Sequence, residues 1–190
     1  MRKMWWYTAC VVLLGSMWLM TGCSSENKSE QLSVFVYPKQ GIPEGFADGL
    51  AQQLEQRLDL QGRELRVAGP SIYNEVKLMV EVAAGDHDLF IVSKEDLTRF
   101  MQSGDGFPLE DWFSQEDYPD GVVERVKMNE QTEMIPTGEK HLYGLPVHES
   151  KLIIEAGKEG DEPWYAFIVP QADPMDLVEE TLKLLAEKGE

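Results

Sequence analysis

Three strand-forming runs alternate with three helix-like segments in the first part of the chain. The strand-forming runs cover residues 32–37, 65–68 and 87–92. Apolar residues recur at helical spacing in residues 46–58, 72–84 and 93–104. Because strands and helices alternate with short loops between them, the pattern predicts a mostly parallel central sheet flanked by helices, an α/β fold.

The second helix-like segment makes a specific prediction about which of its faces is buried. Its apolar residues fall on one side at three- and four-residue spacing, and Gly85 is well placed to end the helix. We expect this face to pack on the sheet through Ile72, Val76, Met79, Val80 and Ala83.

The second half of the chain is less regular. Residues 120–127 suggest a short helix, and residues 133–135 and 141–147 suggest an antiparallel hairpin interrupted at residues 136–138. Two further strands are predicted, at residues 151–155 and 164–169. The chain is expected to end in a helix that starts at Asp173, because Pro174 suits a first helical turn.

The first 22 residues have the order of a secretory leader. A cationic start precedes an apolar run from about residue 4 to residue 20, and small residues then lead to Cys23. This end resembles the lipobox of bacterial lipoproteins, although Met20 occupies the position where leucine is usual. The resemblance implies cleavage before Cys23 and a lipid on its thiol. An uncleaved anchor or a plain secreted protein are the alternatives.

We therefore expect a signal peptide at residues 1–22, a flexible tether at residues 23–31 and one α/β domain at residues 32–190. Cys10 and Cys23 are the two cysteines of the chain, so the domain itself has neither a disulfide nor a thiol nucleophile. The formal net charge of −17 argues against nucleic-acid binding, which needs a basic surface.

The loops at the carboxyl ends of the predicted strands are the natural place for a ligand. Tyr37 and Tyr73 could stack on a sugar or a peptide. Ser71 and Ser93 begin helices, whose free N–H groups can hold an anion. Alternatively, these serines are only helix caps and the tyrosines border the core. The full set of candidate ligand-binding residues is Tyr37, Lys39, Gln40, Ser71, Tyr73, Ser93, Lys94 and His148.

The sequence lacks a recognisable catalytic or metal motif. There is no G-x-S-x-G stretch and no HExxH pattern. His141 and His148 are seven residues apart, so a regular strand would point them to opposite sides. The cluster at residues 85–88 is interpreted as structural. We therefore predict no catalytic residue, no metal site, no cofactor and no enzymatic activity.

Several stretches taken in order resemble the extracellular solute-binding lipoproteins of bacterial ABC importers. They are "VEVAAGDHDLFIVSKEDLTRFMQSG" at residues 80–104, "PLED" at 108–111, "LYGLPV" at 142–147 and "WYAFIVPQADPMDLVEETLKLLAEKG" at 164–189. The resemblance implies a periplasmic-binding-protein type II-like fold. The chain departs from that family because it turns back between residues 155 and 164, which leaves room for a single lobe.

The resemblance leaves three functions open. The first is a lipid-anchored, non-catalytic binding or interaction module on the extracytoplasmic face of a cell membrane, which recognises a protein, a peptide or a cell-wall component. The second is the substrate-binding component of an importer for a sugar or peptide, which completes its cleft by oligomerisation and delivers to a permease. The third is an enzyme of the cell envelope. A single lobe offers only half of a two-lobed site.

Overall fold

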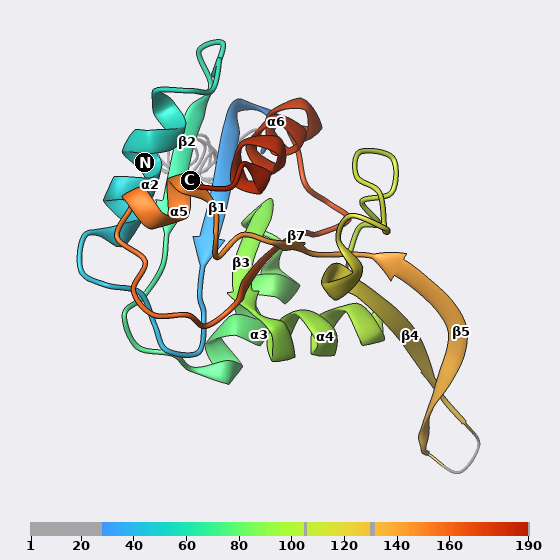
Figure 1. The fold of residues 1–190 in the computed structure, drawn as a ribbon. Coiled ribbons are helices and arrows are strands. Elements are labelled where there is room, and N and C mark those ends of the chain that lie inside the picture. The colour runs from blue at the N-terminus through green and yellow to red at the C-terminus, as the bar shows by residue number, and fades with distance from the viewer. Residues whose placement is uncertain (1–27, 105, 130–131, 190) are drawn as a thin grey trace, which may run out of the picture.

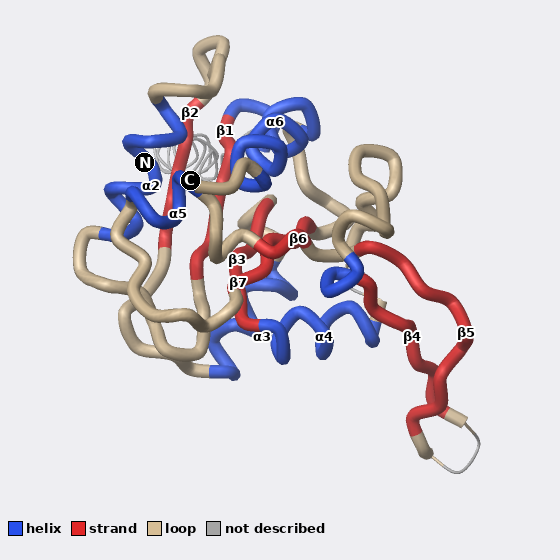
Figure 2. Tube along the Cα trace, in the orientation of Figure 1, coloured by secondary structure: helices blue, strands red, loops and turns tan. Residues whose placement is uncertain are grey.

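A five-stranded sheet with one reversed strand forms the centre of the protein. The computed structural model describes residues 28–104, 106–129 and 132–189. The strand order is β2-β1-β3-β7-β6 (Figures 1 and 2). The strands β2, β1 and β3 are parallel, and β7 runs antiparallel to both β3 and β6. The strands are β1 (Gln31–Val36), β2 (Glu64–Ala68), β3 (Leu89–Ser93), β6 (Leu145–Pro146) and β7 (Trp164–Ile168).

Helices begin and end where local sequence favours it. Asn74 caps α3 by accepting a hydrogen bond from the Lys77 amide, and Ser93 caps α4 through the Asp96 amide. Gly85 and Gly104 end these two helices in the left-handed conformation, which glycine adopts without strain. The helices are α2 (Phe46–Glu55), α3 (Glu75–Ala84), α4 (Lys94–Ser103), α5 (Lys151–Glu155) and α6 (Met175–Ala186).

One face of the sheet is lined with aromatic rings. Phe35, Phe90 and Phe167 are neighbours across β1, β3 and β7, and the rings of Phe90 and Phe167 stack at 5.2 Å. Phe100 from α4 lies 6.2 Å from Phe167, so α4 covers this face. The opposite face meets α2, where Phe46 packs edge-on against Trp164 at 5.3 Å. Because both faces are buried, β3 and β7 are apolar along their length rather than alternating.

A separate two-stranded hairpin extends away from the main sheet (Figure 1). Its strands are β4 (Val122–Met128) and β5 (Met134–Leu142), and the short 3-10 helix η3 (Pro119–Gly121) precedes it. The prediction of a helix at residues 120–127 is therefore wrong. The β-branched Val122, Val123 and Val126 favour a strand, and residues 134–142 offer them a partner.

The predicted hairpin is present but its pairing differs. Residues 133–135 pair with β4 rather than with residues 141–147, and the connection lies at residues 129–133. Pro136 and Gly138, expected to interrupt the hairpin, lie within β5. A proline is tolerated there because β5 is an edge strand with one paired side. Residues 145–146 leave the hairpin and join the main sheet as β6.

Residues 151–155 form the helix α5 and not the predicted strand. Ser150 precedes it, and the Ile154 amide donates to the Ser150 carbonyl at 3.0 Å. Leu152 and Ile153 are buried, whereas Ile154 is exposed. Isoleucine favours strands, but residues 151–155 leave the sheet after β6 and lie against α2 and α6 as a helix, which buries Leu152 and Ile153.

The predicted inner face of α3 is also wrong. Ile72 is 82 % exposed and Val76 is 68 % exposed, and Met79 and Val80 face solvent as well. The buried side of α3 is formed by Leu78 and Val82 instead. The helix is apolar around most of its circumference, so two stripes fit the helical spacing and the pattern does not choose between them.

The predicted fold class is confirmed. The chain has a mostly parallel central sheet flanked by helices together with an antiparallel hairpin. Between α5 and β7 there is only a short turn. Among the described residues, no helix has both the length and the apolar character needed to cross a bilayer. The predicted leader, the tether up to residue 27 and Cys23 lie outside the described residues.

Candidate functional site

Tyr37, Tyr73, Ser93 and Asp96 lie together at the carboxyl ends of β1 and β3. Tyr37 is fully buried, and its hydroxyl donates to the Ile72 carbonyl and accepts from the Asn74 amide. The Tyr73 hydroxyl and the Ser93 hydroxyl both donate to Asp96, at 2.8 and 2.7 Å. Burial, and then the hydrogen bond to Asp96, raises the pKa of Tyr73. Tyr37 therefore holds the backbone of the loop before α3, and its ring lies 5.2 Å from that of Tyr73, which Asp96 holds in place.

The other predicted residues near this cluster are also engaged. Lys39 forms an ion pair with Glu95 at 2.5 Å. The Gln40 amide, in the orientation that satisfies both neighbours, accepts from the Trp164 indole N–H and donates to Glu162. Ser71 is exposed, and its carbonyl lies so close to Gly41 that a Cβ there would collide with it. The structure thus brings Tyr37, Lys39, Tyr73 and Ser93 to one end of the sheet.

Lys94 differs from these neighbours. Its Nζ lies 4.8 Å from the centre of the Tyr165 ring, and among the described residues it has neither a hydrogen bond nor a salt bridge. Burial lowers the pKa of Lys94, and the negative charge of Asp120 opposes that change. Burial, and then the charge of Asp120, raises the pKa of Tyr165. Asp120 therefore lies within electrostatic reach of both groups.

A cavity of about 380 Å³ lies at the carboxyl end of β6, where the chain leaves the sheet. Its volume falls in the range of small-molecule sites. Three segments that are distant in sequence form its wall: the loop that includes η3, the turn after β6 and the end of α6. The residues that line it are Asp117, Tyr118, Pro119, Asp120, Pro146, His148, Glu149, Ser150, Leu185, Ala186 and Lys188.

Two polar atoms in this wall are buried without a hydrogen-bond partner among the described residues. They are the hydroxyl of Ser150, a residue only 2 % exposed, and Nδ1 of His148. Ser150 precedes α5, yet its side chain makes no capping hydrogen bond. A buried hydroxyl without a partner costs stability. Such a group beside a cavity is therefore available to a ligand.

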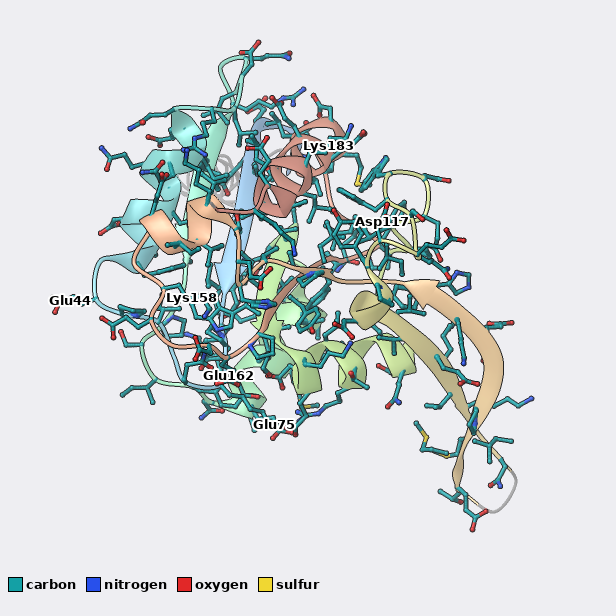
Figure 3. The ribbon with its side chains drawn as sticks, viewed as in Figure 1. Glu44, Glu75, Asp117, Lys158, Glu162 and Lys183 are labelled. Atoms are coloured by element: carbon teal, nitrogen blue, oxygen red, sulfur yellow. The ribbon has the colours of Figure 1, made fainter. Side chains whose placement is uncertain are left out.

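A second hollow, of about 610 Å³, adjoins the first and shares His148, Glu149 and Lys188 with it. Lys188 donates to Glu149 at 2.9 Å, and this ion pair lowers the pKa of Glu149 and raises that of Lys188. Figure 3 labels two residues that border these hollows, Asp117 on the loop before η3 and Lys158 on the turn after α5.

The charges of the smaller cavity determine what it can bind. Asp117 and Asp120 have no salt-bridge partner among the described residues, whereas the charges of Glu149 and Lys188 offset each other. The wall therefore presents two carboxylates, a hydroxyl and an imidazole. This set accepts hydrogen bonds from hydroxyl or ammonium groups of a ligand.

Sequence reasoning found His148 but missed Ser150, Asp117 and Asp120. A serine directly before the apolar residues 152–153 has the pattern of a helix cap, which could have drawn attention to Ser150. The assignment of residues 151–155 as a strand hid that pattern. Nothing in the sequence shows that residues 117–120 return to the edge of β6.

A buried serine and a buried histidine lie next to a partly exposed glutamate at the opposite end of the sheet. Ser33 Oγ is 2.7 Å from His87 Nδ1, and His87 Nε2 is 3.4 Å from Glu81. Asp88 accepts from the Ser33 amide at 2.8 Å. These residue types occur in nucleophilic catalysis. Ser33, however, is 2 % exposed within β1, and Phe35 stacks on the imidazole, so the cluster joins β1 to α3. Among the described residues, no group of three or more His, Cys, Asp or Glu is arranged for a metal ion.

No family model matches the chain, and no curated protein matches it. A solved structure, thiaminase I from Bacillus thiaminolyticus, matches with a TM-score of 0.33 and 20% sequence identity over 61% of this chain and 28% of that chain. This chain thus spans less than a third of that protein. At this TM-score the likeness assigns no reaction or substrate.

These comparisons correct two predictions. The inferred membership of the solute-binding lipoproteins is contradicted, because neither a family model nor a curated protein supports it and the neighbour found is thiaminase I. The prediction of no enzymatic activity is also contradicted, because that neighbour is an enzyme. The family to which the chain belongs is not shown.

Proposed function

We propose that this chain is an extracytoplasmic ligand-binding domain, held to a membrane by a lipid on Cys23, and that its cavity at the end of β6 binds a small polar ligand. The observation that carries the proposal is the Ser150 hydroxyl, which is buried in the cavity wall without a hydrogen-bond partner among the described residues. A ligand group that bonds to Ser150 removes the cost of that burial.

The chemistry of the wall favours a ligand rich in hydrogen-bond donors. Asp117 and Asp120 accept hydrogen bonds, and Tyr118 adds an aromatic surface. A sugar or a short peptide with a free amino group offers both hydroxyl or ammonium donors and apolar faces. The overall net charge of −17 disfavours an anionic ligand.

Thermal unfolding with a panel of mono- and disaccharides and short peptides tests the cavity. A ligand present at a hundred times its dissociation constant adds about 2.7 kcal/mol of stability, which raises Tm by roughly 5–10 °C. We expect Ser150→Ala to reduce that rise to about half, because loss of one hydrogen bond weakens binding about tenfold and removes about 1.4 kcal/mol of the ligand effect. The control, Ser103→Ala, lies on α4 and bonds to carbonyls of its own helix, and it should keep the rise. A rise of equal size in Ser150→Ala would contradict the proposed site.

Membrane attachment is tested separately. In the native host, Cys23→Ser should move the protein from the membrane fraction to the soluble fraction, and mass spectrometry of the wild-type protein should find a lipid on the N-terminal cysteine. Retention of Cys23→Ser in the membrane fraction would contradict the lipid anchor and would leave the cavity proposal intact.

A further inference from the structure

Lys94 occupies an unusual position for a lysine. It is the first residue of α4, directly after β3 and the capping residue Ser93. The amino end of a helix carries partial positive charge, so acidic residues are favoured there and a lysine is not. The next two residues, Glu95 and Asp96, follow the usual preference. A residue that goes against the local helix preference, and makes no stabilising contact in exchange, marks a candidate functional position.

The surroundings of Lys94 leave its amine uncommitted. The amine lies over the face of Tyr165, and none of the acidic groups among the described residues forms an ion pair with it. Lys39 lies at the same end of the sheet, but its amine forms an ion pair with Glu95. Of these two lysines, Lys39 is therefore ion-paired and Lys94 is not.

The pKa values of the two lysines shift in opposite directions. Burial lowers the pKa of Lys94, whereas the hydrogen bond from Lys39 to Glu95 raises the pKa of Lys39. Only the neutral amine has a lone pair for attack on an electrophile, and desolvation is a common way to activate a lysine. The amine of Lys94 is therefore available as a nucleophile at a lower pH than that of Lys39.

The position of Lys94 also connects it to the proposed ligand cavity. Asp120, whose charge acts on Lys94, lines that cavity. Pro146 lines it too, and pairs with Tyr165 between β6 and β7. Lys94 is thus linked to the cavity wall through the charge of Asp120 and through Tyr165, at the carboxyl end of the sheet where ligands of α/β folds bind.

We propose that Lys94 forms an imine with the carbonyl carbon of a small polar aldehyde or ketone, such as the open-chain form of a sugar. The lone pair of Nζ attacks the carbonyl carbon, and the electron pair of the C=O bond moves to the oxygen, which takes up a proton. The nitrogen loses one proton to give the neutral carbinolamine, and its hydroxyl takes up a second proton and leaves as water while the nitrogen lone pair forms the C=N bond. Loss of the remaining N–H proton gives the neutral imine. One water is released, and nothing is oxidised or reduced. This inference rests on the proposed function, since it names a ligand class for the same end of the sheet.

Reductive trapping tests the proposal. The purified domain is incubated with glyceraldehyde and sodium cyanoborohydride near neutral pH, and the adducts are mapped by proteolysis and mass spectrometry. We expect Lys94 to be modified faster than Lys39, since the neutral fraction of an amine at a given pH increases as its pKa falls. Exposed Lys183 serves as a second reference. Modification of Lys94 no faster than that of Lys39 and Lys183 would overturn the proposal.

Two variants make the test sharper. Lys94→Arg keeps the positive charge over Tyr165 but removes the nucleophile, so it should fold and lose the rapid adduct. Asp120→Asn removes the charge that opposes the lowered pKa, so the pH profile of modification at Lys94 should shift to lower pH. An unchanged profile would show that Asp120 does not act on this amine and would contradict the proposed geometry.

The outcome separates this inference from the proposed function. Thermal shift with sugars and peptides, measured without reductant, reports on the cavity alone. A ligand-induced shift without a Lys94 adduct overturns the imine and keeps the binding proposal. A rapid Lys94 adduct without any shift contradicts the cavity as the ligand site and supports the reactive amine.

Discussion

Ser150 and Ser93 make a matched pair in which the same substitution should change stability in opposite directions. Both serines directly precede a helix, and their exposed fractions are 2 % and 3 %. Ser93 accepts a hydrogen bond from the Asp96 amide and donates to the Asp96 carboxylate. The Ser150 hydroxyl has no such partner among the described residues.

The magnitudes follow from these contacts. Loss of a helix cap costs about 1 kcal/mol, and loss of a hydrogen bond to a charged group adds to that cost, so Ser93→Ala should destabilise the domain by about 1–2 kcal/mol. Ser150→Ala removes a buried hydroxyl without a partner and should stabilise the domain by about 1 kcal/mol. For a domain of this size, 1 kcal/mol corresponds to a change in Tm of roughly 2–4 °C.

Urea and thermal denaturation of the two variants and the wild-type domain, without added ligand, provide the measurement. An unchanged denaturant slope would show that the compared states are the same. If Ser150→Ala were as destabilising as Ser93→Ala, the Ser150 hydroxyl would have a structural partner. Its availability to a ligand, on which the proposed function depends, would then be refuted.

Three further predictions concern other parts of the domain. Burial lowers the pKa of His87 from 6.5, so the unfolded chain binds a proton at a higher pH than the folded chain does, and stability should fall as the pH drops below about 6.5. Denaturation measured above and below this pH should show a smaller fall in stability for His87→Gln. Leu78→Ala should cost about 2–5 kcal/mol, whereas exposed Val80→Ala should change stability by less than about 0.5 kcal/mol, and equal losses in urea denaturation would contradict the orientation of α3. Lys94→Met should be more stable than the wild type at neutral pH, because burial disfavours the charged amine. The difference in stability should shrink as the pH rises toward 10.5, and a constant difference across this range would contradict the lowered pKa of Lys94.

The elements of the first half of the chain could be predicted from the sequence because each is marked by local chemistry. Helix spacing from Phe46 to Leu54, the cap at Ser93 and the stops at Gly85 and Gly104 all act within a few residues. The same local rules failed where contacts between distant parts of the chain determine whether a segment is a helix or a strand. Residues 122–128 become a strand because residues 134–142 lie beside them, and residues 151–155 become a helix that packs against α2 and α6.

The candidate site was only partly visible in the sequence for the same reason. Strand-end residues such as Tyr37 and Tyr73 were found, because parallel strands end at one edge, but the sequence does not show that their hydroxyls are bonded to the Ile72 carbonyl and to Asp96. His148 was found because it follows residues 142–147, which resemble the strand that crosses from one lobe to the other in solute-binding proteins. Asp120 and Lys188 join it only because η3 and the end of α6 meet at β6, which no periodicity encodes.

The position of β7 sets the order in which the domain can be completed. This strand is formed by residues 164–168, near the end of the chain, yet it lies between β3 and β6 in the sheet. A chain that emerges from its N-terminus, from a ribosome or through a narrow pore, therefore lacks a strand inside its sheet until residues 164–168 are free. The stacked pair of Phe90 and Phe167 rings cannot form before that point. The domain should consequently fold only after β7 has emerged, and a nascent chain stopped before residue 164 should remain sensitive to protease.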